Sequence, residues 1–204
     1  MVVIVNYGSG NIGSVANIIK KAGATALVSS DAADIERATR LILPGIGAFD
    51  TCMGNLNASG LIPALRERVV NAGIPLLGIC VGMQMLMGGS EEGVLPGLGW
   101  IAGRTRRFLH TTDAALRVPH MGWNDVVVKR AAPLFAGLES AARFYFVHSY
   151  HVQCERAEDV LGETVYGYPF ASAVQSGNIS GVQFHPEKSH KFGLALIRNF
   201  IAGS

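Results

Sequence analysis

Hydrophobic positions in the first half of the chain follow two different spacings. Short apolar runs predict strands at Val2–Val5, Thr25–Val28, Leu41–Leu43 and Ile74–Ile79. Between them, apolar residues that recur every three or four positions predict helices at Asn11–Ala22 and Leu61–Val70. Because these strands alternate with helices, the pattern indicates βαβ units and a parallel sheet.

One stretch without charge, Val69–Ser90, has the length of a membrane span. It contains several Gly residues, a Pro and polar side chains, which a lipid-facing helix would have to accommodate. We interpret it as a helix end, a buried central strand and the start of a second helix, because a central parallel strand is covered on both faces. The N-terminus lacks the charged and apolar regions of a signal peptide, so we expect no membrane association.

The pattern changes from about Trp100 onward. Short apolar runs separated by Gly, Pro and polar residues predict antiparallel additions and hairpins at Arg106–Leu109, Asp125–Val128, Arg143–Val147, Val160–Val165, Ala171–Gln175 and Ser180–Phe184. A final helix is expected at Lys191–Ile201. The chain has no internal repeat or linker, so we expect a single domain over residues 1–204.

Composition narrows the class of protein. Of 204 residues, 49% are hydrophobic and 16% charged, which is enough apolar material for a sizeable core. The formal net charge of +2 argues against nucleic acid as a partner. Cys52, Cys80 and Cys154 are odd in number and lack metal-ligand spacing. We therefore expect no disulfide framework, no metal, no cofactor and a reducing cytoplasm.

The N-terminal segment from Gly8 to Gly13 matches the dinucleotide fingerprint GxGxxG. It lies between the first strand and the first helix, and Asp31 follows the second strand where a ribose-binding acid would stand. The alternative is a tight turn into a helix, in which glycines let the backbone bend. The rest of the chain favours the tight turn over a nucleotide site, because other segments point to chemistry at a cysteine.

A cysteine stands where the strand Ile74–Ile79 meets the next helix. The segment Gly78-Ile-Cys80-Val-Gly82 has the form of a nucleophile elbow, in which side chains two residues to either side would crowd the turn. The following helix would favour a thiolate at Cys80 and leave the N–H of Val81 free for an oxyanion. The alternative is a small buried core residue, which is how we interpret Cys52, in a loop or helix start, and Cys154.

A thiolate in such a site needs a general acid and base nearby. His185 and Glu187 stand two residues apart, so an extended segment places both side chains on one face, where the carboxylate can fix the imidazole. Pro186 blocks a helix there. His120 and His148 are alternative bases, but neither has a carboxylate at this spacing.

A glycine-rich loop follows the third predicted strand, in the segment Pro44–Phe49. In an open parallel sheet the carboxyl ends of the strands form the ligand crevice, so this loop and the cysteine turn are expected to meet there. The backbone N–H groups of Ile46 or Gly47 and of Val81 could then bracket a tetrahedral oxygen.

The chain resembles the class I (triad) glutamine amidotransferases, and among them the branch that serves histidine biosynthesis. The matching motifs run in order along nearly the whole chain: NYGSGN (6–11), PGIGAF (44–49), GICVGMQ (78–84), SEEG (90–93), VPHMGWN (118–124), YFVHSY (145–150) and GVQFHPEKS (181–189). The resemblance implies an α/β, flavodoxin-like, open and mostly parallel sheet flanked by helices, with added antiparallel strands in the C-terminal half.

The resemblance also implies a role for each matching residue. Catalysis is assigned to Cys80 as nucleophile, His185 as acid and base, and Glu187 as the group that orients His185. The oxyanion hole is assigned to Ile46, Gly47 and Val81, with a loop at Ile46 that reorients before catalysis. Glutamine binding is assigned to Gly47, Gln84, His148, Ser149 and Tyr150, and partner contact to Asn11, Trp123, Tyr145 and Lys188.

The implied activity is hydrolysis of L-glutamine through a thioester. The ammonia would pass to a (β/α)₈-barrel synthase and cyclase subunit, in a heterodimer that makes imidazole glycerol phosphate. Segments 97–101 and 189–193 resemble more closely a paralogous set, whose synthase amidates nucleotide-linked or surface-polysaccharide sugars.

Two other classes of protein remain possible. A free-standing cysteine hydrolase would need no partner, and the segments VPHMGWN and YFVHSY argue against it. A non-catalytic binding module would have lost part of the triad, whose three residues are all present.

Overall fold

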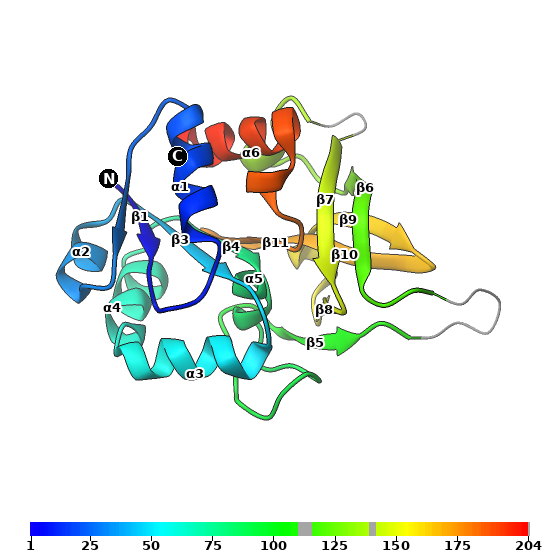
Figure 1. Ribbon diagram of the computed structural model, residues 1–204, viewed down its shortest axis with the longest axis horizontal. Coiled ribbons are helices and arrows are strands. Elements are labelled where there is room, and N and C mark those ends of the chain that lie inside the picture. Colours follow the sequence, from blue (N-terminus) through cyan, green and yellow to red (C-terminus); the bar gives the residue numbers. More distant parts are fainter. Residues whose placement is uncertain (110–115, 139–141, 204) are drawn as a thin grey trace.

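The computed structural model describes residues 1–109, 116–138 and 142–203 (Figure 1). The alternation predicted for the first half is confirmed, with strand and helix bounds within about two residues at most ends. The strands are β1 (Val2–Val5), β2 (Ala26–Ser29), β3 (Arg40–Gly45) and β4 (Leu76–Cys80). The helices predicted between them are α1 (Ile12–Lys21) and α4 (Ile62–Arg66), which continues as a π-helical turn, Glu67–Asn71. The uncharged stretch divides as expected, into a helix end, β4 and α5 (Val81–Met85).

The parallel part of the sheet has the strand order β2-β1-β3-β4-β11. This is the flavodoxin-like order, in which ligands bind beyond the carboxyl ends of the strands. Its last member, β11 (Ile179–Val182), pairs in parallel with β4, Ile179 opposite Leu76 and Val182 opposite Ile79. The prediction that Ser180–Phe184 is an antiparallel addition was therefore wrong on its β4 side. All four residues of β11 are buried, as expected for a strand inside a parallel sheet.

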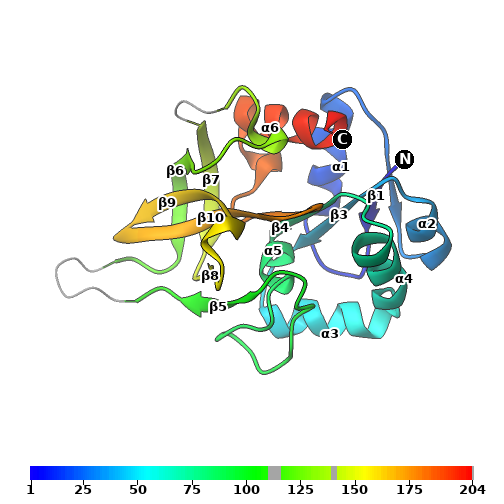
Figure 2. The same ribbon diagram turned by 180° about the vertical axis from the view of Figure 1, so that it is seen from behind.

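Helices cover both faces of this sheet. The first helix, α1, and the last, α6 (His190–Ala202), lie on one face, and α3 (Phe49–Ser59) and α4 on the other (Figures 1 and 2). The helix α3 was not predicted, although its buried side chains Phe49, Cys52, Met53 and Leu56 have helical spacing. The helix α2 (Ala32–Arg37) was not predicted either; its first turn is capped by the Asp31 carboxylate, which accepts from Ala33 N at 2.9 Å.

The predicted antiparallel additions are confirmed in the second half of the chain. Antiparallel pairing runs in the order β11-β10-β9-β6-β7, and β8 pairs with both β5 and β10. The strand β8 was not predicted, and β5 begins three residues before the predicted run Arg106–Leu109. The strands are β5 (Gly103–Arg107), β6 (His120–Val128), β7 (Ala142–His148), β8 (Tyr150–Cys154), β9 (Val160–Tyr166) and β10 (Tyr168–Ser176).

The fold brings three strand ends together. Gly45 at the end of β3 lies opposite Cys80 at the end of β4, and β11 leads from its own end toward His185. The strand β3 runs through Pro44 and ends at Gly45, two residues beyond the predicted end at Leu43. Past Ile42 it pairs with β4 and no longer with β1, so the missing N–H of Pro44 leaves no gap in a β1 ladder.

The N-terminal glycines serve this packing. A side-chain carbon at Gly10, where φ is +113°, would lie 2.8 Å from the ring of Pro44, and the Tyr7 hydroxyl donates to the Pro44 carbonyl at 2.6 Å. Since Asp31 is a helix cap, both elements of the dinucleotide fingerprint have structural explanations. Within the described ranges, no helix has the length and apolar character needed to cross a membrane.

Candidate active site

Cys80 occupies a sharp turn between β4 and α5. Its φ of 54° and ψ of −113° lie outside the regions that L-residues normally adopt, and the residue is 4% exposed. Such backbone strain is typical of residues held in place for function. Because α5 has only five residues, we attribute the charge environment of Cys80 mainly to its neighbours rather than to the helix dipole.

The glycines around Cys80 allow three backbone segments to touch. A Cβ atom at Gly78 would lie 2.8 Å from the Gly82 carbonyl oxygen, and one at Gly82 would collide with the Leu43 carbonyl. A Cβ atom at Gly45 would lie 2.6 Å from the backbone nitrogen of Gly82. The prediction that side chains two residues from the cysteine crowd the turn is confirmed.

His185 and Glu187 form a buried pair. The His185 Nδ1 and Glu187 Oε1 atoms are 2.8 Å apart, and the two side chains are 3% and 1% exposed. The local geometry differs from the expected extended segment. His185 is extended, but Pro186–Lys188 form one turn of 3₁₀-helix that brings the carboxylate back to the ring. Proline suits the first position of such a turn, where its N–H is not needed.

The electrostatics of this pair are set by its neighbours. Burial lowers the pKa of His185, but hydrogen bonds and charge interactions with Cys80 and Glu187 outweigh it and raise the pKa to about 10. Asn11 Nδ2 donates to Glu187 Oε1 at 3.3 Å, whereas Glu187 Oε2 is buried without a partner among the described residues. The raised pKa of His185 favours the imidazolium form of this ring beside Cys80.

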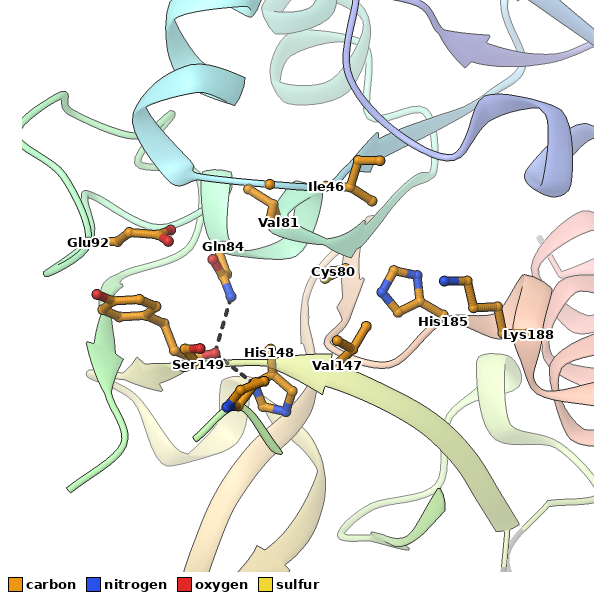
Figure 3. Close-up of a pocket in the computed structure, with 13 residues that line it drawn as sticks. Ile46, Cys80, Val81, Gln84, Glu92, Val147, His148, Ser149, His185 and Lys188 are labelled. Carbon is orange, nitrogen blue, oxygen red and sulfur yellow. Dashed lines mark hydrogen bonds between the residues drawn. The ribbon is translucent and has the colours of Figure 1, made fainter. Parts of the chain in front are cut away.

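A cavity of about 420 Å³ opens over Cys80. Figure 3 shows His185 at one end of it and Glu92 at the other, with Cys80 between them and Ile46 and Val81 along one wall. Every residue expected in the oxyanion hole or around glutamine lines it. The lining consists of Ile46, Gly47, Cys80, Val81, Gln84, Glu92, Pro119, Val147, His148, Ser149, Tyr150, His185 and Lys188.

Two residues that line this cavity, Gly47 and Val81, carry the backbone N–H groups expected at an oxyanion hole. Val81 is the first residue of α5, so the helix itself does not use its N–H. The Ile46 carbonyl accepts from Cys52 Sγ at 3.2 Å, which turns it toward α3. In a trans peptide the next N–H, that of Gly47, points the opposite way. Ile46 itself is 46% exposed.

Two polar residues at the site received no role from the sequence. Glu92 accepts from Phe49 N at 2.9 Å and lines the cavity, while its neighbour Glu91 pairs with Arg106 at 2.6 Å on the surface. Nothing in the motif SEEG distinguishes these two acids. Gln183 is fully buried and its Nε2 donates to Cys80 Sγ at 3.7 Å. In the sequence, the position of Gln183 two residues before His185 was the feature that could have indicated a place in the site.

The residues expected at a partner surface lie next to the triad. Asn11 contacts Glu187, and Lys188 Nζ lies 5.9 Å from the centre of the Tyr145 ring. Trp123 is 41% exposed and packs edge-on against Tyr145. Of the alternative bases, His148 lines the same cavity, but its ring is engaged by His120, at 2.9 Å, and by the Tyr150 carbonyl, at 2.7 Å. No group of three or more His, Cys, Asp or Glu side chains suited to a metal ion occurs in the described part of the chain.

Solved structures share this fold. A crystal structure titled glutamine amidotransferase superposes with a TM-score of 0.74 at 21% identity, covering 98% of this chain and 97% of the other. The structure of PurLQS from Thermotoga maritima gives a TM-score of 0.69 at 19% identity, with coverage of 98% and 96%.

Relatives found by sequence have higher identity to this chain than these solved structures. The imidazole glycerol phosphate synthase subunit HisH of Bdellovibrio bacteriovorus is 49% identical over 98% of both chains. Subunits named HisH 2 from Pseudomonas aeruginosa and Methanococcus maripaludis are 48% and 50% identical over the same shares. The family model for glutamine amidotransferase class-I matches residues 3–203. The chain belongs to the class-I glutamine amidotransferase family.

Proposed function

We propose that this chain is the glutaminase subunit of an imidazole glycerol phosphate synthase and supplies ammonia for histidine biosynthesis. The observation that carries the proposal is the identity of 48–50% with HisH subunits over nearly the full length of both chains. Identity of this extent includes surface segments as well as the catalytic motifs, and it is the surface that selects a partner.

The proposed reaction begins with attack of the Cys80 thiolate on the side-chain amide carbon of L-glutamine. The His185 imidazolium gives its proton to the leaving nitrogen, so the C–N bond breaks and ammonia departs from a thioester. His185, now neutral, takes a proton from water, which attacks the thioester and releases glutamate. Glu187 holds the ring in place through Nδ1 and stabilises its charged form.

Gly47 and Val81 are the proposed donors to the oxyanion, with Ile46 as the hinge of their loop. Both residues line the cavity over Cys80, and the Gly47 N–H points away from α3. A missing oxyanion donor lowers the rate about 10²–10³-fold. If the loop at Ile46 forms the oxyanion hole only in the complex, the isolated subunit has very low glutaminase activity.

Glutamine is the proposed occupant of the cavity. Its amide is placed at Cys80, and its α-ammonium is placed at the Glu92 carboxylate, which lies at the opposite end (Figure 3). Gln84, His148, Ser149 and Tyr150 line the wall between them. A charged hydrogen bond to the ammonium group would select an amino acid over a simple amide.

The proposed partner is a (β/α)₈-barrel synthase and cyclase subunit that binds over Asn11, Trp123, Tyr145 and Lys188. Two of these residues connect directly to the triad, since Asn11 bonds Glu187 and the Tyr145 carbonyl accepts from His185 N at 2.9 Å. Exposed Met121 and Trp123 on β6 add apolar surface, which suits an interface. A partner docked there would act on Glu187 through the Asn11 side chain and on His185 through the Tyr145 backbone.

The names of two relatives favour a second candidate for the synthase that accepts the ammonia. Both are called HisH 2, a number that distinguishes them from a first HisH subunit. Segments 97–101 and 189–193 are the ones that resemble the paralogous, sugar-amidating set. The alternative proposal is therefore a synthase that amidates a nucleotide-linked or surface-polysaccharide sugar, with the same triad. In both cases the free thiols of Cys52, Cys80 and Cys154 suit a reducing cytoplasm.

Glutamate release from glutamine tests the proposal. The purified chain is assayed alone and then with the barrel subunit from the histidine pathway of the same organism and its ribonucleotide substrate. Strong stimulation supports the histidine assignment. No stimulation, with a barrel subunit that is active on added ammonia, rejects that assignment in favour of the sugar-amidating synthase.

A further inference from the structure

A chain of hydrogen bonds runs behind the cavity wall from the outer strands to Cys80. It passes from Asn124 to His120, from His120 to His148, and from His148 to the Tyr150 carbonyl. Gln84 Nε2 donates to that carbonyl at 3.2 Å and to Gln183 Oε1 at 3.1 Å, and Gln183 Nε2 donates to Cys80 Sγ. The proposed reaction assigns no role to His120 or Asn124.

The outer end of the chain has a fixed direction. Asn124 Oδ1 accepts from Asp125 N at 2.8 Å, and Asn124 Nδ2 donates to the Val165 carbonyl at 2.9 Å. These two backbone groups decide which end of the amide is the donor. The contact of Asn124 Nδ2 with His120 Nε2, at 3.2 Å, therefore requires an unprotonated Nε2. His120 carries its proton on Nδ1.

The inner end independently requires the same direction. The Tyr150 carbonyl can only accept, so His148 Nδ1, 2.7 Å away, carries the proton. A neutral His148 then has an unprotonated Nε2, which accepts from His120 Nδ1 at 2.9 Å. Both ends give the same tautomer for each ring. Burial lowers the pKa of His120 to about 4 and also lowers that of His148, so both rings are neutral at physiological pH.

The consequence for the cavity lies at Gln84. Both N–H groups of its amide are used, by the Tyr150 carbonyl and by Gln183 Oε1. The amide oxygen is the polar group left for a ligand. In Figure 3 the nitrogen end of Gln84 points toward the segment of Val147, His148 and Ser149. A flipped amide would place its oxygen against two acceptors, which is unfavourable.

We propose that His120 and Asn124 are positioning residues of the glutamine site, because they hold His148 and the Tyr150 carbonyl in the arrangement that presents the Gln84 amide oxygen to the substrate. The inference rests on the proposed glutaminase function. We expect the two residues to affect glutamine binding, because Gln84 would contact the substrate equally in the ground state and the transition state. Such a contact affects KM rather than kcat.

His120→Phe is the variant that tests this relay. A phenyl ring fits the stack of His120 between Phe146 and Tyr166, whose ring centres lie 4.8 and 4.1 Å away, but cannot donate to His148. In the complex with the synthase subunit we expect the KM for glutamine to rise about tenfold with kcat changed less than about threefold. His120→Asn, whose amide nitrogen can replace Nδ1 as donor, should restore KM to within about threefold of wild type.

A matched control is available in the same aromatic cluster. His151 is also buried, contacts Phe108 and Phe170, and bonds Tyr168 and Val152 rather than the relay. His151→Phe should therefore leave KM unchanged. An unchanged KM in folded His120→Phe, or an equal rise in His151→Phe, overturns the proposal.

A measurement without activity separates this inference from the proposed function. Nitrogen-15 NMR of the histidine-labelled chain reports which ring nitrogen carries the proton. We expect the Nδ1-protonated neutral tautomer for His120 and His148 at neutral pH, and an Nε2-protonated form of either ring overturns the relay. If the wild-type complex does not hydrolyse glutamine, the proposed function fails while the NMR result still decides the relay.

Discussion

Replacing Glu187 by Gln removes one charge from the buried triad and leaves the shape of the side chain. Glu187 Oε1 lies 2.8 Å from His185 Nδ1, and its side chain is 1% exposed, so solvent does not screen the interaction. A hydrogen bond to a charged group contributes about 1.5–3 kcal/mol. At 1.36 kcal/mol per unit, its loss would lower the pKa of His185 by about 1 to 2 units.

Two readouts follow from this change. Glutamate release by the complex should fall about 10- to 150-fold. The alkaline limb of the activity profile, set by loss of the His185 proton, should move down from about pH 10 by about 1 to 2 units. Glu91→Gln removes the same charge from a surface pair with Arg106 and serves as the control, with activity and profile unchanged.

Stability provides a third readout that needs no substrate. Because folding raises the pKa of His185 from 6.5 to about 10, the pair stabilises the fold fully below about pH 6.5 and loses this contribution as the pH rises toward 10. Thermal unfolding of wild type should show this decline, and that of Glu187→Gln should show less of it. An unshifted alkaline limb together with an unchanged decline would refute the assignment of Glu187 as the group that orients His185.

Three further predictions concern the nucleophile, its turn and the substrate. Cys80→Ala should abolish glutamate release and keep the circular dichroism spectrum of wild type; residual turnover would contradict the nucleophile assignment. Gly82→Ala should lower the free energy of unfolding in urea by about 1–3 kcal/mol, because its Cβ meets the Leu43 carbonyl, whereas Gly13→Ala, with nothing within 4 Å, should not. Glu92→Gln should raise the KM for glutamine about tenfold with little change in kcat, as measured by glutamate release, and an unchanged KM would remove Glu92 from the ammonium site.

Local rules were enough to predict the turn at Cys80 from the sequence. The glycines around Cys80 are required because the backbone itself fills the space beside the turn, and this constraint is visible in a five-residue pattern. His185 and Glu187 could also be paired from the sequence, because only Pro186 lies between them and side chains two positions apart share one face of an extended segment. Even so, the pair is brought together by a 3₁₀ turn and not by an extended segment.

Where neighbours decide the structure, the sequence was less informative. The run around Ser180 has the same apolar character as the antiparallel strands near it, so only its contact with β4 reveals a parallel strand. The acids Glu91 and Glu92 are equivalent in sequence, yet one pairs with Arg106 on the surface and the other faces the cavity. Direction of pairing and choice of partner depend on elements far away in the chain.

The sequence by itself determined the α/β alternation, the strained cysteine turn and the adjacent histidine and glutamate, because each depends on steric limits within a few residues. Only the tertiary structure decided how these parts meet. Parallel pairing of β4 with β11 sets the end of one strand beside the end of the other, and this places His185 against Cys80. The relay from Asn124 to Gln84 likewise joins β6, β7, β8 and α5, and its hydrogen bonds exist only once those elements have packed.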